Sequence, residues 1–170
     1  MTITNRFLPI FSIALLAIVA VLPWGLSADK RYVLPLLPYV AIYFWNSRYS
    51  GLLPEWVPFF AGLTVDVLSN GPLGFWSLIY LLGFILSSKM RHIFGGVGAG
   101  RWLMFLSSLT LLLFASWSIT SLYSLEKAEW GPFIWAAVMA GLAYPVLTRI
   151  LASLSPQQHH SASDRMVRRL

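Results

Sequence analysis

The chain alternates between long apolar stretches and short breaks that are polar or rich in glycine and proline. Six apolar stretches lie near residues 7–26, 32–46, 53–69, 72–88, 102–124 and 131–150. A helix needs about 20 apolar residues to cross a bilayer. The pattern therefore predicts an all-α integral membrane protein with about six transmembrane helices in a single membrane domain, residues 1–154. Residues 155–170 are polar and basic, and they predict a disordered tail.

Two of these stretches leave alternatives open. The first follows Arg6 as a signal peptide would, but it is longer than a typical signal-peptide core and its cleavage site is weak, which favours a retained span. The second is short for a span and contains Pro35 and Pro38. It predicts a short, tilted or broken helix, or a re-entrant one.

Composition agrees with a membrane location, and the sequence contains no residue pattern that indicates catalysis. Of the 170 residues, 58% are hydrophobic and 11% are charged, and the mean hydropathy is +0.71, whereas soluble domains are about a quarter charged. The chain has no cysteine, which excludes thiolate catalysis, cysteine-bound metals and disulfides. The three histidines form no metal-ligand pattern, and no phosphate loop or catalytic triad is present. We therefore expect no enzyme activity, no cofactor and no metal.

The basic residues predict the topology. The net charge is +6, and the basic residues fall at the ends of apolar stretches, which indicates cytoplasmic span ends rather than a nucleic-acid partner. Six spans with both termini in the cytoplasm leave only Lys30, Arg31 and Lys127 outside. The cytoplasmic side, next to the lipid headgroups, then holds Arg6, Arg48, Lys89, Arg91, Arg101, Arg149, Arg165, Arg168 and Arg169.

One acidic residue, Asp66, interrupts an apolar stretch. A carboxylate at the bilayer centre costs about 2.5–3.5 kcal/mol on insertion scales, so it normally faces protein or water. Three roles for Asp66 are considered. It could make a structural contact that tethers the following turn or a partner, it could bind a ligand, or it could couple to an ion. Asn70 is only about one helical turn away, roughly 6 Å, which places Asp66 towards the outer end of the helix. Because no other stretch supplies an ionisable partner in its middle, the structural contact is favoured.

Glycine and proline surround Asp66. Asn70-Gly71-Pro72 is a strong turn signal and predicts an external hairpin between the third and fourth stretches. We expect the small residues beside Asp66 to let these two helices approach closely. The predicted structural or partner-binding hairpin thus consists of Gly62, Asp66, Gly71, Pro72 and Gly74.

The same hairpin resembles the MreD family of bacterial rod shape-determining proteins. The matching residues are Gly-Leu-Thr-Val-Asp-Val-Leu at 62–68 and Gly-Pro-Leu-Gly at 71–74. Two earlier segments also match, a stretch of prolines followed by aromatic residues at 35–45 and Pro54-Glu55-Trp56. The resemblance implies a non-catalytic inner-membrane subunit of the peptidoglycan-synthesising elongation machinery. It implies an MreC-like partner, and through it MreB-like filaments, a RodA-like glycosyltransferase and a penicillin-binding transpeptidase.

The resemblance also implies a fold similar to the substrate-binding subunits of energy-coupling-factor vitamin transporters. A small-solute binding subunit is therefore the alternative function. Those subunits often carry an Ala-x-x-x-Ala stripe on the first helix, whereas the alanines here are Ala14, Ala17 and Ala20, a spacing that disfavours the transporter. An ion-coupled carrier that uses Asp66 is a third hypothesis.

Overall fold

Six α-helices make up the described part of the chain, and no strand occurs there. The computed structural model describes residues 4–22, 25, 34–49, 51–70, 72–94, 99–124 and 129–154. The helices are α1 (Thr4–Val21), α2 (Leu36–Arg48), α3 (Trp56–Ser69), α4 (Phe75–Phe94), α5 (Ala99–Ser124) and α6 (Gly131–Leu154). The prediction of an all-helical protein is confirmed. The predicted tail, residues 155–170, lies outside the described residues.

The helix bounds differ from the apolar stretches at several ends. The first helix ends at Val21, although the apolar stretch runs to residue 26. The third helix begins only at Trp56, after a turn that contains Pro54. The fourth continues through Lys89 and Arg91 to Phe94. Lysine and arginine are good helix formers, so a charged segment ends an apolar stretch without ending the helix.

Within the described residues, two helices are long and apolar enough to cross a membrane. These segments are Gly100–Leu122 and Gly131–Leu154, with mean hydropathies of 1.7 and 1.6. The apolar parts of α1, α3 and α4 are shorter, and α2 has 13 residues, a length of roughly 20 Å against about 30 Å for the hydrocarbon core. The structure is therefore compatible with a membrane protein, but six full-length spans do not follow from helix length.

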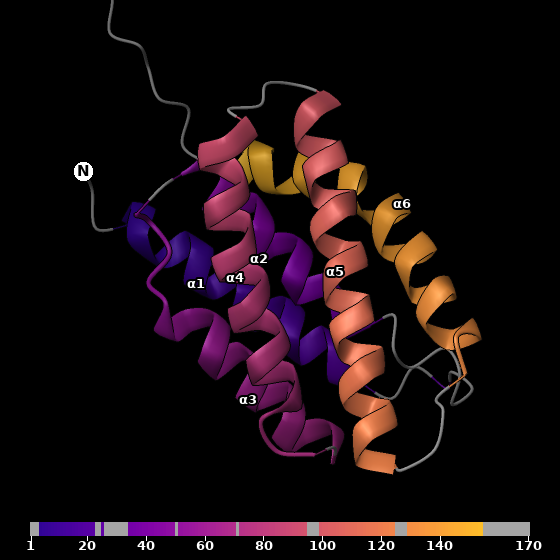
Figure 1. Ribbon diagram of the computed structural model, residues 1–170. Coiled ribbons are helices and arrows are strands. Elements are labelled where there is room, and N and C mark those ends of the chain that lie inside the picture. The colour runs from indigo at the N-terminus through magenta and orange to yellow at the C-terminus, as the bar shows by residue number, and fades with distance from the viewer. Residues whose placement is uncertain are drawn as a thin grey trace, which may run out of the picture.

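Helix α2 is the centre of the bundle. It packs against α1, α4 and α6, while α4 also contacts α5 (Figure 1). Nearly every residue of α2 is buried, namely Leu36 and Pro38 to Asn46, as expected for a helix that is surrounded on all sides. Of the alternatives for this stretch, the structure has a short continuous helix. Pro38 lies in its first turn, where the missing N–H breaks no helical hydrogen bond.

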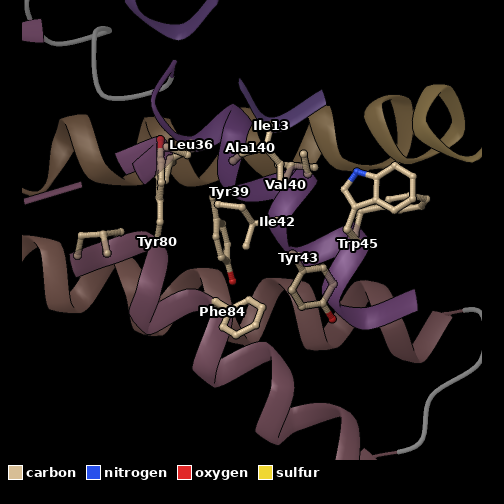
Figure 2. Close-up of a cluster of buried hydrophobic side chains, with 14 of the residues drawn as sticks. Ile13, Leu36, Tyr39, Val40, Ile42, Tyr43, Trp45, Tyr80, Phe84 and Ala140 are labelled. Atoms are coloured by element: carbon tan, nitrogen blue, oxygen red, sulfur yellow. The ribbon is translucent and has the colours of Figure 1, made fainter. Parts of the chain in front are cut away.

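Polar side chains of α2 bind its neighbours through hydrogen bonds. The indole Nε1 of Trp45 donates to Ser12 Oγ of α1 at 2.9 Å. The amide Nδ2 of Asn46 donates to the Phe84 carbonyl at 2.9 Å and to Ser87 Oγ at 2.6 Å, both on α4. Figure 2 shows how side chains project from α2 in different directions into the core. Buried polar groups that find partners in this way fix which helix faces which.

A second aromatic side chain of α2, Tyr39, occupies a gap left by a glycine. Its hydroxyl is 2.8 Å from Ser108 Oγ of α5, and the side chain is fully buried. A Cβ at Gly83 of α4 would lie 2.4 Å from Tyr39 Cε2 and 2.9 Å from Leu112 Cδ1. Helix α4 can therefore contact this part of the core only because residue 83 has no side chain.

We predict that Gly83→Ala destabilises the protein. The added methyl group overpacks a core in which Tyr39 cannot move freely, and such changes cost about 1–3 kcal/mol. The measurement is the thermal unfolding midpoint of the purified protein. Gly100→Ala is the matched control, because nothing lies within 4 Å of a Cβ there. Equal midpoints for the two variants would contradict the packing seen at Gly83.

Candidate functional site

Asp66 lies in the last turn of α3, and its side chain is 0% exposed. The helix ends just after it. Asn70 adopts the left-handed conformation, with φ 54°, and its N–H bonds to the Asp66 carbonyl. Such a left-handed residue is a common way to end a helix. The chain then turns and α4 packs back along α3.

The Asp66 carboxylate binds the beginning of α4. Oδ1 accepts a hydrogen bond from the Trp76 N–H at 2.9 Å. Oδ2 accepts one from the Gly74 N–H at 2.9 Å, and longer ones from the Ser77 N–H at 3.4 Å and Ser77 Oγ at 3.2 Å. The first N–H groups of a helix lack partners within that helix. Asp66 thus acts as an N-cap supplied by a neighbouring helix, and its negative charge meets the positive end of the α4 dipole.

This arrangement shows which groups Asp66 contacts and corrects how exposed its side chain is. The sequence places its side chain towards the outer end of the helix, reaching for the turn at Asn70. The structure instead buries it completely and joins it to residues eight to eleven positions further along the chain. The reason is that α4 folds back on α3, which brings the open N–H groups of α4 beside the carboxylate. Asp66 therefore holds its own hairpin.

Gly62 makes this approach sterically feasible. It is buried one turn before Asp66 on the same helix. A Cβ on Gly62 would lie 2.4 Å from both the Cα and the N of Ser77, and 2.6 Å from the Trp76 carbonyl carbon. These are backbone atoms of the residues that Asp66 binds, and they cannot rotate away. The close approach expected of Gly62 is present.

The remaining predicted hairpin residues have other roles. Gly74 has φ +93°, and a Cβ placed on it would meet nothing within 4 Å, so it contributes a left-handed backbone and an N–H donor rather than the close packing that we expected. Pro72 is exposed, and its carbonyl accepts a hydrogen bond from the Phe75 N–H at 3.2 Å. Gly71 lies outside the described residues.

One residue of this site was missed by sequence reasoning, and a second has a partner that the sequence does not give. Ser77 donates to Asp66 through both its backbone and its side chain, and a serine in the first turn of a helix is the available sequence signal. Tyr80, one turn later, is fully buried and donates its hydroxyl to the Pro35 carbonyl at the start of α2. The identity of this partner depends on how α2 and α4 meet, which no local pattern gives.

The site is suited to holding helices together. Both carboxylate oxygens of Asp66 are occupied by donors from α4 and the turn before it. Within the described residues, no three His, Cys, Asp or Glu side chains come close enough to hold a metal ion. Comparison of the chain with protein-family models, with curated proteins and with solved structures finds no match. The resemblance to the MreD family and to the transporter subunit fold therefore stays a prediction.

We predict that Asp66→Ala lowers the thermal unfolding midpoint. The substitution leaves the Trp76 and Gly74 N–H groups without their acceptor, and an unsatisfied buried donor costs about 1–3 kcal/mol. Thr64→Val is the control on the same helix, because the Thr64 side chain is exposed and its hydroxyl donates to the Phe60 carbonyl within α3. An Asp66→Ala protein as stable as the Thr64→Val protein would show that the carboxylate does not hold α4.

We also predict that Gly62→Ala destabilises the hairpin independently of charge. The methyl group must push α4 away from α3, at a cost of about 1–3 kcal/mol or more, since backbone opposes it. Gly131→Ala serves as the control, because a Cβ there meets nothing within 4 Å. The unfolding midpoints of both variants decide the matter, and an unchanged midpoint for Gly62→Ala would refute the close approach.

Proposed function

We propose that this protein is a non-catalytic scaffold subunit of the bacterial elongation machinery, required for rod shape. It would lie in the inner membrane with six helices and with both termini in the cytoplasm. Its partners would be an MreC-like protein and, through it, MreB-like filaments, a RodA-like glycosyltransferase and a penicillin-binding transpeptidase. The proposal rests on the resemblance of the hairpin to the MreD family, together with what that hairpin does in the structure.

The observation that carries the proposal is the role that the residues resembling the MreD family have in this hairpin. Gly62 and Asp66 join α3 to α4, which is a packing role rather than a chemical one. The outward side of the same pair is apolar and exposed, with Phe59, Phe60, Val67, Leu68, Leu73 and Leu78. A rigid pair of helices with an apolar outer face suits contact with lipid and with a partner helix.

The placement of two basic residues supports the proposed topology. Arg48, at the end of α2, and Arg101, in the first turn of α5, line one cavity. Both residues therefore lie at the same end of the bundle, as the six-span topology with cytoplasmic termini requires. Basic residues gathered at one end are typical of a cytoplasmic face.

The two other hypotheses gain less from the structure. An ion-coupled carrier needs a carboxylate that can release and regain its partners, whereas Asp66 is buried and bonded through both oxygens. A vitamin-binding subunit needs a pocket of about 300–1,000 Å³. Among the cavities lined by described residues, two measure 170 and 10 Å³, and neither of these two would enclose such a ligand.

The test is a chromosomal Asp66→Ala allele at native expression in the source bacterium. We expect rounded, swelling cells and at least a severalfold loss of co-purified MreC-like protein, because the hairpin no longer presents a fixed surface. Thr64→Val is the control and should keep rod shape. Membrane levels of each variant are measured by immunoblot, so that loss of insertion is separated from loss of assembly.

Rod-shaped cells with the Asp66→Ala allele, at wild-type membrane levels, would contradict the scaffold role of the hairpin. Depletion of the whole protein separates the alternatives. A nutrient auxotrophy with normal cell shape would favour the solute-binding subunit, whereas spherical cells in rich medium would favour the scaffold.

A further inference from the structure

A polar groove of 170 Å³ opens at the end of the bundle, away from the Asp66 site. It lies where the end of α2, the beginning of α5 and the second half of α6 meet. Its lining residues come from these three helices and are Phe44, Ser47, Arg48, Arg101, Trp102, Tyr144 and Thr148. One water takes about 30 Å³ of liquid, so the groove has room for a group several times that size.

Two arginines line this groove, and the described residues supply no counter-charge to either. Arg48 and Arg101 come from different helices, and no carboxylate of the described chain forms an ion pair with either. Glu55 precedes α3, Glu129 precedes α6, and Asp66 is bound to the start of α4. Arg48 also sits over the Phe44 ring at 5.8 Å from its centroid. Converging positive charges of this kind favour an anion from outside the chain.

A tyrosine lines the groove together with the two arginines. Tyr144 is 8% exposed and lines the groove. Its ring is fixed by stacking on Phe105, with ring centroids 4.3 Å apart, and by an edge contact with Tyr43 at 6.0 Å. Tyr43 is itself held by a hydrogen bond to the Arg101 carbonyl at 3.1 Å. The groove therefore combines two charged donors with a hydroxyl group whose position is set by the core.

The position of Arg101 adds to the positive potential. It lies in the first turn of α5, a 26-residue helix, whose N-terminus carries a partial positive charge. Beside it, Trp102 is 44% exposed. Tryptophan favours the boundary between hydrocarbon and headgroups. A phospholipid whose phosphate lies in the groove could therefore place its glycerol and acyl parts against the Trp102 ring.

We propose that this groove binds a phosphate-bearing anion, held by the guanidinium groups of Arg48 and Arg101 and by the Tyr144 hydroxyl. Arginine suits phosphate because its planar fork of N–H donors can form two parallel hydrogen bonds. Two sources share this chemistry, the headgroup of an anionic phospholipid and free inorganic phosphate. The site is independent of the Asp66 hairpin and of the proposed scaffold role.

The test uses the full-length protein in detergent micelles. Native mass spectrometry measures binding of phosphatidylglycerol, with phosphatidylcholine as the neutral headgroup, and inorganic phosphate serves as a second probe and competitor. We expect phosphatidylglycerol to bind more tightly than phosphatidylcholine. Arg48→Gln and Arg101→Gln should each weaken that binding roughly fivefold, the effect expected for one charge near an anionic lipid.

The control is Arg149→Gln, which removes the same charge from an exposed residue that does not line the groove. It should leave phosphatidylglycerol binding within about twofold of the wild type. Thr148→Leu fills the groove without changing charge and should weaken binding, which keeps the test valid if an arginine variant misfolds. Competition by inorganic phosphate would identify a free-anion site, and its absence would identify a lipid headgroup site.

Two results would overturn the proposal. One is equal binding of phosphatidylglycerol and phosphatidylcholine together with no binding of inorganic phosphate. The other is an equal loss on Arg149→Gln and on the two groove variants, which would mean that general surface charge attracts the lipid.

Discussion

The structure depends on a single buried carboxylate that caps a helix other than its own. Asp66 of α3 accepts the N–H groups of Trp76 and Gly74 at the start of α4, which would otherwise lack partners in an apolar setting. Burying this charge is costly unless it is hydrogen-bonded, so the carboxylate and the helix start stabilise each other. Gly62 allows the backbones of α3 and α4 to lie this close, because it has no side chain.

The same principle extends from the hairpin to the core. Helix α2 is surrounded on all sides, and its polar atoms are satisfied by the helices around it. Tyr80 of α4 donates to the Pro35 carbonyl at the start of α2, and Asn46 near its end donates to the Phe84 carbonyl. Lipid-like surroundings give helices little hydrophobic reason to associate. Close packing at glycines and directional hydrogen bonds therefore select the arrangement, and the hairpin becomes one rigid part of a larger bundle.

The sequence predicted the six helices and the hairpin well, because apolar stretches and a glycine-proline turn are local signals. It predicted the burial of Asp66 poorly. Its short distance from the turn at Asn70 argued against deep burial, whereas burial depends on α4 folding back over the side chain. Gly83 gave no local signal, since its importance comes from Tyr39 on another helix. The partner of Tyr80, the Pro35 carbonyl, depends likewise on how two helices meet. Helix ends such as Phe94 could not be read from the apolar stretches, because charge ends an apolar stretch before it ends a helix.

The most direct test of this account is residue-resolved amide hydrogen exchange by NMR in lipid nanodiscs. N–H groups in the first turn of a helix normally exchange quickly, because they have no partner within that helix. If Asp66 holds α4, the amides of Gly74 and Trp76 should be protected in the wild-type protein as strongly as amides in the middle of the helix. Exchange of both amides at the rate of unpartnered groups would contradict the capping role of Asp66.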